Sequence, residues 1–290
     1  MNNGINVLSL FDGISCGMVA LERAGIKVNK YYASEIEPNA IKVSQKNYPD
    51  IIQLGDVTKW RDWDIDWNSI DLLIGGSPCQ GFSSAGCQLN FNDPRSKLFF
   101  EYVNILNHIE QQNPNIKFML ENVKMKPEWA DIISQYLGVG YIEINSRYFS
   151  AQNRVRWYWA NFDISPYTDK GISLKDIVDD EYIHSASKRT RPLPKEKRRS
   201  LCLEVSGDNK SYCLLTVNLN NLLTPLPKGR YIDCNINDYP YRKMTPREME
   251  RLQTVPEEYV GDITSDAAAK LLGNGWTVDV IAHIFKGLNF

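Results

Sequence analysis

The sequence predicts an α/β fold in which a mostly parallel, doubly wound sheet carries helices on both faces. Short apolar runs of strand length alternate with helical patterns over residues 5–160. Two of these runs lead into loops of glycine, serine or proline, as is typical where a strand meets a crossover helix. The chain has 290 residues, of which 43% are hydrophobic, so it can build a full core without disulfides or metal ions.

Apolar runs bounded by turn residues predict the strands. They lie at residues 5–10, 31–34, 71–75, 116–120, 141–149 and 155–160. The first run ends at the turn Phe11-Asp12-Gly13, and the third enters a loop of Gly, Ser and Pro. The last two runs predict a closing hairpin.

Apolar residues at helical spacing predict the helices between these strands. They lie at residues 15–24, 37–48, 95–109 and 129–137. In the first, Met18, Val19 and Leu21 share one side. In the second, Pro38 stands near the first turn, where its missing N–H is tolerated. The third is strongly apolar, which predicts that it is buried.

The character of the chain changes after residue 162. Residues 163–240 are rich in proline and show few helical periods, which predicts a small irregular module. Within them, Ser187 to Ser200 carries seven basic residues and one acidic residue. This run is the strongest local concentration of positive charge in the module.

Helical signals return in the last 50 residues. Thr245-Pro246-Arg247-Glu248 is a capping box with proline at the first helical position. The segment 277–285 predicts an apolar helix at the end of the chain. We therefore expect a main domain at 1–162, the irregular module at 163–240, and helices at 241–290 that return to the main domain.

Composition excludes several classes of protein. Lys and Arg number 33 against 35 Asp and Glu, so any contact with nucleic acid must come from a local patch. The six cysteines form no CxxC pair and there are only three histidines, so no metal site is predicted. The sequence shows neither a signal-peptide pattern nor a long apolar span, and low cysteine density is typical of a reducing compartment. We expect a cytoplasmic protein without membrane contact.

The loop after the first strand has the residues of a nucleotide-like binding site. Gly13 and Gly17 allow close approach to the backbone, and the following helix begins with free N–H groups. Glu35 ends the second strand, where a carboxylate can accept both ribose hydroxyls. NAD would require the GxGxxG pattern for its pyrophosphate, and Asp12 would repel phosphate. A cationic cofactor such as S-adenosylmethionine fits Asp12 better.

Two reactive residue types follow two other strands. Cys79 lies in the loop Gly75-Gly-Ser-Pro-Cys-Gln-Gly-Phe-Ser83, and Glu121 ends the strand at 116–120. Ligands of open α/β sheets bind at the carboxyl ends of strands. An isolated cysteine is usually a buried apolar residue and an isolated glutamate usually forms an ion pair. Their common position at one rim of the sheet instead indicates catalysis.

The ordered motifs of the chain resemble those of DNA (cytosine-5) methyltransferases. The motifs cover nearly all of the chain except residues 163–240. Two of them, Pro-Cys-Gln-x-Phe-Ser and Gln-x-Arg-x-Arg, are together highly specific for the family. They are Phe11-Asp-Gly13 with Gly17, Glu35, Gly55-Asp56-Val57, Gly76-Ser-Pro-Cys79-Gln-Gly-Phe-Ser83, Glu121-Asn122-Val123, Gln152-Asn-Arg154-Val-Arg156, Arg242-Lys-Met-Thr-Pro-Arg-Glu248, Arg251-Leu-Gln253 and Gly273-Asn274. Leu8-Ser-Leu-Phe-Asp-Gly13, Ala33-Ser-Glu35 and Gly273-Asn-Gly-Trp276 are similar to the animal de novo enzymes.

The resemblance implies a Rossmann-like, S-adenosylmethionine-dependent fold and a covalent mechanism. Cys79 would add to carbon 6 of a flipped-out cytosine, which makes carbon 5 nucleophilic. Glu121 would bind N3 and the exocyclic amine. Arg154 and Arg156, two positions apart on a predicted strand, would face one side, hold the base carbonyl and order the cysteine loop.

The resemblance also assigns cofactor and DNA contacts. The cofactor residues are Phe11, Asp12, Gly13, Gly17, Glu35, Ile36, Asp56, Val57, Pro78, Asn274 and Trp276. The loop after Cys79 would close over the base, with Gln80, Ser83 and Arg95 near DNA. Gly275 departs from many relatives, which carry a small hydroxyl residue there. The contact of that hydroxyl with the cofactor carboxylate is either missing or replaced by a backbone N–H.

The irregular module is predicted to recognise the target sequence in double-stranded DNA. The basic run contributes Lys195, Lys197, Arg198 and Arg199 for phosphate contacts. Asn218 and Asn220 lie in a loop-rich stretch, and asparagine is suited to reading adenine edges. The alternative is that the basic run is a solvated linker.

Three other functions are considered. A tRNA methyltransferase of the same superfamily would carry a Cys-Phe-Thr element, which the sequence lacks. A non-catalytic DNA-binding relative would have lost the nucleophile or the acid, and a dehydrogenase would need the dinucleotide fingerprint. The recognised sequence, a restriction partner and the oligomeric state stay open, although the animal enzymes associate.

Overall fold

The computed structural model describes residues 4–78, 97–181, 184–192, 199–216, 220–223, 231–232 and 240–290. The chain divides into two compact units. The first unit consists of Met1–Ile144, Val155–Pro166 and Val278–Phe290, and the second of Asn145–Arg154 and Tyr167–Thr277.

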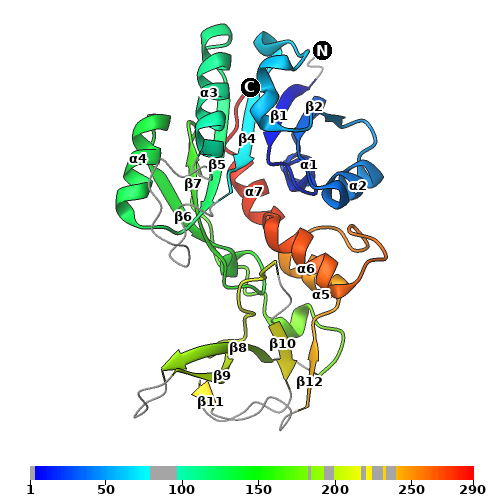
Figure 1. Cartoon of the computed structure of the whole chain (residues 1–290). Helices are drawn as coiled ribbons and strands as arrows, with labels where there is room; N and C mark the ends of the chain where they lie inside the picture. Colours follow the sequence, from blue (N-terminus) through cyan, green and yellow to red (C-terminus); the bar gives the residue numbers. More distant parts are fainter. Residues whose placement is uncertain are drawn as a thin grey trace. The chain divides into compact units, whose positions relative to one another are not determined.

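The first unit contains a seven-stranded sheet (Figure 1), ordered β3-β2-β1-β4-β5-β7-β6. Its strands are β1 (Ile5–Leu10), β2 (Val28–Ser34), β3 (Ile52–Gln53), β4 (Leu72–Gly76), β5 (Lys117–Val123), β6 (Tyr141–Asn145) and β7 (Val155–Ala160). The pairs β1–β2, β1–β4, β2–β3 and β4–β5 are parallel, whereas β7 runs antiparallel to β5. The predicted α/β fold class is confirmed.

The helices of this unit match the sequence prediction within a few residues. They are α1 (Cys16–Arg23), α2 (Pro38–Asn47), α3 (Lys97–Gln112), α4 (Pro127–Leu137) and α7 (Val278–Phe285), with short 3-10 turns at Val57–Asp62 and Trp67–Ser69. The predicted strand at 141–149 was too long, because β6 ends at Asn145. The Asn145 side chain accepts a hydrogen bond from the N–H of Arg147 and starts a 3-10 turn there.

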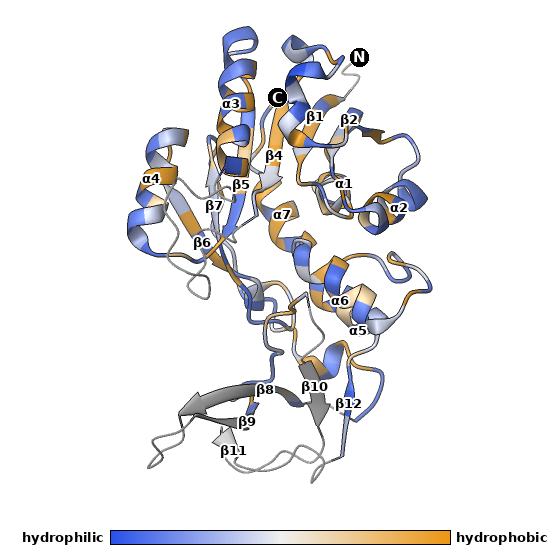
Figure 2. Cartoon of the chain, viewed as in Figure 1, coloured by the Kyte–Doolittle hydropathy of each residue, from blue (hydrophilic) through white to orange (hydrophobic). Residues whose placement is uncertain are grey.

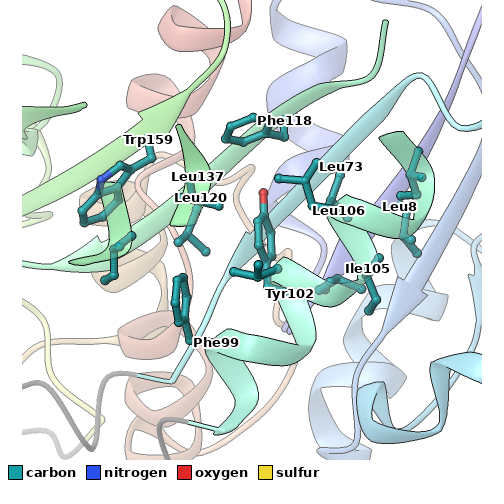
Figure 3. Close-up of a cluster of buried hydrophobic side chains, with 14 of the residues drawn as sticks. Leu8, Leu73, Phe99, Tyr102, Ile105, Leu106, Phe118, Leu120, Leu137 and Trp159 are labelled. Atoms are coloured by element: carbon teal, nitrogen blue, oxygen red, sulfur yellow. The ribbon is translucent and has the colours of Figure 1, made fainter. Parts of the chain in front are cut away.

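Helix α3 packs on one face of the sheet. Phe99 and Tyr102 point from it toward Leu120 and Leu73, as Figure 3 shows, and Ile105 belongs to the same buried cluster. These three residues of α3 are at most 1% exposed. Such burial of large apolar side chains stabilises the unit by roughly 1.5–3 kcal/mol for each side chain.

The opposite face of the sheet is buried as well. Val7 and Ser9 alternate along β1 with the residues that face α3, and they are 0% and 1% exposed. Helices α1 and α7 pack against each other within this unit, and Arg23 forms an ion pair with Asp279 at 2.7 Å. Figure 2 shows α7 as a largely apolar helix.

The second unit is more regular than the sequence predicted. It contains an antiparallel sheet, ordered β11-β9-β8-β10-β12. Its strands are β8 (His184–Pro192), β9 (Arg199–Val205), β10 (Asn220–Leu223), β11 (Tyr231–Ile232) and β12 (Tyr241–Lys243). The expectation of an irregular module was wrong for these strands, since their pairing supplies regularity that single apolar runs do not reveal.

The helices at the end of the chain are divided between the two units. Helices α5 (Pro246–Gln253) and α6 (Ser265–Asn274) pack on each other in the second unit, and only Val278–Phe290 belong to the first. This differs from the predicted return of all residues after 240. The capping box is confirmed, because Thr245 and Glu248 exchange both of its hydrogen bonds. None of the helices in the described ranges could span a membrane.

Candidate active site

The loop between β1 and α1 has an unusual backbone. Phe11, Gly13 and Ser15 have φ values of 56°, 61° and 60°. Only glycine adopts this left-handed region without cost, so the surrounding contacts must hold the other two residues there. The sequence indicated the turn at Gly13, but it gave no sign that Phe11 and Ser15 would share its conformation.

Glu35 holds this loop together with the start of α2. Its Oε2 accepts a hydrogen bond from the N–H of Gly13 at 2.7 Å, and its Oε1 accepts from the N–H groups of Ile36 and Glu37 at 2.8 Å each. The carboxylate is thus fixed at the carboxyl end of β2. The sequence predicted this position for Glu35 but not its role in organising the backbone.

Asp12 is engaged by hydroxyl groups. Its Oδ1 accepts a hydrogen bond from Tyr31 at 2.8 Å, and its Oδ2 accepts from Ser15 at 2.5 Å. Desolvation raises the pKa of Asp12 from 3.8 to about 6, with hydroxyl hydrogen bonds opposing the shift and the nearby charge of Glu35 adding to it. Tyr31 and Ser15 were not predicted as site residues, because nothing in the sequence links them to Asp12.

The loops after β2 and β3 add further predicted residues. Ile36 is 70% exposed, and Val57 is buried. Asp56 caps the 3-10 turn that follows, and its pKa is lowered by hydrogen bonds from the N–H and hydroxyl of Thr58. A hydrogen bond of 2.7 Å from Ser34 to the carbonyl of Gly55 fixes this loop next to β2.

The loop that leads to Cys79 is anchored from β5. Asn122 donates hydrogen bonds to the carbonyl and the hydroxyl of Ser77, at 3.3 and 3.2 Å. Pro78 follows as the last described residue before Cys79, and Cys79 itself lies outside the described residues. Asn122 is therefore a positioning residue for this loop. The sequence showed it within the Glu121-Asn122-Val123 motif but indicated no role.

Glu121 and Arg156 form an ion pair at the end of β5. Arg156 Nε lies 3.0 Å from Glu121 Oε1, and the two side chains are 14% and 11% exposed. Contacts between a guanidinium and a carboxylate are charge-assisted and among the stronger hydrogen bonds in proteins. The structure therefore brings together two of the four residues predicted for catalysis.

Arg154 has different surroundings. It precedes β7 rather than lying in it, so the predicted pair on one strand face is wrong for this residue. Its guanidinium donates to the carbonyls of Leu214, Gly273 and Gly275, all in the second unit. Those acceptors flank Asn274, an exposed residue at the end of α6, and Trp276 follows them. Whether Arg154 also contacts a base stays a prediction.

Most predicted DNA contacts fall outside the described residues. These are Gln80, Ser83, Arg95, Lys195, Lys197, Arg198 and Asn218. Arg199 begins β9 and pairs with Pro192 of β8, so both ends of the basic run lie in paired strands. Asn220 begins β10 and pairs with Ser187. In the described parts of the chain, no group of three or more His, Cys, Asp or Glu could hold a metal ion.

Comparison with solved structures shows the same fold. A methyltransferase of Entamoeba histolytica, EhMeth, has a TM-score of 0.68 at 16% identity and covers 98% of this chain and 97% of its own. A DNMT2 mutant of Spodoptera frugiperda has a TM-score of 0.64 at 19% identity, and the match covers 97% of this chain and 98% of the DNMT2 chain.

Comparison of sequences identifies the family. The type II methyltransferase M1.ScrFI of Lactococcus lactis subsp. cremoris is 32% identical over 96% of this chain and 76% of its own. The type II methyltransferase M.HpaII of Haemophilus parainfluenzae is 28% identical over 94% of this chain and 86% of its own. The family described as C-5 cytosine-specific DNA methylase matches residues 5–197 and 167–289. This chain belongs to that family.

Proposed function

We propose that this protein methylates carbon 5 of cytosine in double-stranded DNA, with S-adenosylmethionine as methyl donor and Cys79 as covalent nucleophile. The observation that carries the proposal is the shielded Glu121–Arg156 ion pair at the end of β5. The next residue of that strand, Asn122, holds the loop that leads directly to Cys79. The strand β5 thus carries both the acid and the residue that binds Ser77, two positions before Cys79.

The reaction proceeds through addition and elimination. The Cys79 thiolate forms a bond to carbon 6, while Glu121 binds N3 and the exocyclic amine and stabilises the protonated ring. Carbon 5 would then be nucleophilic toward the methyl group that S-adenosylmethionine supplies when it is bound. Loss of the carbon 5 proton to water restores the ring and releases the thiolate. The target base must leave the duplex stack for this chemistry.

The residues around the first loop fit the proposed cofactor. Glu35 can accept further hydrogen bonds from ribose hydroxyls, and the exposed Ile36 side chain offers an apolar surface for adenine. Asp56 would accept a hydrogen bond from the adenine amine. Asp12 would face a sulfonium, which supplies an electrophilic methyl group, and no phosphate-binding cradle of the dinucleotide type is needed. Phe11, Gly17, Val57, Pro78, Asn274 and Trp276 complete the proposed contacts.

The second unit supplies the proposed recognition of DNA. The basic run would neutralise phosphates, and Asn218 and Asn220 would read base edges. Support comes from the strands β8 and β9, which pair at both ends of the basic run and leave residues 193–198 between them. Such a hairpin is a common way to present cationic side chains to a groove.

Bisulfite sequencing of DNA from cells that express the protein tests the function directly. Methylated cytosines in one sequence context are expected with the wild type and none with Cys79→Ala. The purified wild type should also form a denaturant-resistant adduct with DNA that carries 5-fluorocytosine in that context, because elimination needs a proton at carbon 5. Methylation by Cys79→Ala, or no adduct on a verified substrate, would overturn the mechanism.

A further inference from the structure

The second unit contains a buried polar network around the Gln-x-Arg motif. Gln152 and Gln253 are both 0% exposed, and their side-chain amides are 3.1 Å apart. Gln152 also accepts a hydrogen bond from the N–H of Leu214 at 2.8 Å. Thr277 donates to Gln253 at 2.9 Å and accepts from Ser146 at the same distance. Buried networks of this kind fix one arrangement of the backbone when their groups are satisfied.

Arg154 connects this network to the end of α6. Its Nη2 donates to the carbonyls of Gly273 and Gly275, at 3.1 and 2.9 Å. Gln253 donates to Gly275 as well and to Leu272, at 3.2 and 2.5 Å. The last carbonyls of a helix lack partners within it, and a cation there also complements the helix dipole. These contacts determine the backbone on both sides of Asn274.

The same guanidinium reaches the segment that leads into β10. Arg154 Nη1 donates to the carbonyl of Leu214 at 3.1 Å. The neighbouring Leu215 lies so close to Gly273 that a Cβ on that glycine would be 2.6 Å from the Leu215 carbonyl carbon. The Arg154 side chain therefore binds both the segment at Leu214 and the end of α6, where the two backbones are in contact. The segment at Leu214 continues along the chain toward Asn218 and Asn220.

We infer that Arg154 is a positioning residue that sets the loop 273–276 for cofactor binding and couples it to the segment that enters β10. The inference rests on the proposed function, in which Asn274 and Trp276 contact the cofactor and Asn218 and Asn220 read DNA. It assigns Arg154 an effect on cofactor affinity, whereas Arg156, paired with Glu121, acts on the chemical step.

The test uses Arg154→Lys in the full chain. A lysine ammonium cannot span three carbonyls as the planar guanidinium does. The affinity for S-adenosylhomocysteine, measured by calorimetry, should fall about tenfold, as expected for the loss of one or two charge-assisted hydrogen bonds. At saturating cofactor, Arg156→Lys should lower the single-turnover rate by a larger factor than Arg154→Lys does. By linkage, S-adenosylhomocysteine should change the affinity for DNA less in this variant than in the wild type.

Arg251→Lys is the matched control. Arg251 lies in α5 of the same unit and also donates to a carbonyl, that of Ile177, while its other side-chain partners are Asp179 and Glu257. This variant should keep wild-type cofactor affinity. Arg154→Lys with normal affinity and a lowered single-turnover rate would overturn the inference, since Arg154 would then act on the base.

Thr277→Val provides a second, nearly isosteric variant. It removes the hydrogen bonds to Gln253 and Ser146, and cofactor affinity should fall several-fold. If Arg154→Lys does not fold, as judged by circular dichroism, unchanged affinity in Thr277→Val overturns the inference. A wild type that binds no S-adenosylhomocysteine and forms no adduct would instead contradict the proposed function.

Discussion

Arg156 and Glu121 pair diagonally across the antiparallel strands β5 and β7. Arg156 stands opposite Val123 in the register, and Glu121 stands opposite Tyr158, so the two charged side chains share one face of the sheet. The strand pairing itself therefore brings Nε to 3.0 Å from Oε1. A shift of one residue in this register would turn the two groups to opposite faces.

Glu121→Gln should lower the rate of methyl transfer by roughly 10²–10⁴, the usual effect of losing a positioned acid–base group. The amide oxygen can still accept from Arg156, so the fold should be kept. Single-turnover kinetics and calorimetry with S-adenosylhomocysteine check both expectations. A variant that lost cofactor affinity and kept its rate would contradict the assigned role.

Asn122→Asp should slow formation of the covalent adduct with 5-fluorocytosine DNA. The carboxylate cannot donate to Ser77 and would be repelled by its carbonyl, so the loop before Cys79 would lose its anchor from β5. Ser77→Ala keeps the carbonyl acceptor and should have a smaller effect. Equal adduct rates in the wild type and Asn122→Asp would show that this contact does not position the loop.

Glu35→Ala should weaken binding of S-adenosylhomocysteine by roughly 1–3 kcal/mol, because charged hydrogen bonds to the ribose and to the backbone of the first loop are lost together. Glu37→Gln changes a carboxylate two residues away and serves as the control. The outcome that would refute the site is an unchanged dissociation constant for Glu35→Ala, measured by calorimetry.

Asp12→Asn should stabilise the protein at pH 8 by roughly 1–3 kcal/mol. The pKa of Asp12 is raised from 3.8 to about 6 in the folded state, so its contribution to stability is full below about pH 4 and is lost as the pH rises through about 6. Above that pH the wild type carries the cost of a desolvated charge, which asparagine removes. Urea unfolding at pH 4 and pH 8 should show the gain only at the higher pH, and a gain of the same size at both would contradict the assignment.

Replacement of Lys195, Lys197, Arg198 and Arg199 by Gln should weaken DNA binding equally on all sequences. The slope of log K against log salt should shrink by nearly one for each lost phosphate contact. Replacement of the exposed Lys27, Lys30, Lys42 and Lys46 by Gln removes the same charge from the first unit and controls for net charge. An unchanged slope for the first variant would identify the basic run as a linker.

Changes at Asn218 or Asn220 should instead alter the preferred flanking bases.

Local signals in the sequence were sufficient for much of the first unit and for the start of α5 in the second. The apolar run of β1 and the capping box at Thr245 each depend on residues that are close in the sequence, so both could be predicted. The diagonal pairing of Glu121 with Arg156 depends on the register between distant segments. The sequence indicated both residues but not their contact.

Other features depend on interactions that no local pattern encodes. Ser15 was part of a predicted helix start, and its left-handed backbone and bond to Asp12 depend on the packing of the loop. Arg154 looked equivalent to Arg156, because residues two apart share a face on a strand. It precedes β7 instead, and it donates to the carbonyls of Gly273 and Gly275, which lie 119 and 121 residues further along the chain.

These long separations in sequence limit which contacts can form while the chain is being synthesised. The guanidinium of Arg154 has no access to two of its carbonyl acceptors until Gly275 has left the ribosome. The first unit also cannot complete its packing until the last helix has been synthesised, because α1 packs on α7 and Arg23 pairs with Asp279, 256 residues later. Non-local contacts of this kind slow folding. A nascent chain that stops before residue 273 therefore exposes apolar surface of α1 and leaves a buried cation incompletely bound, which makes it a substrate for chaperones and proteases.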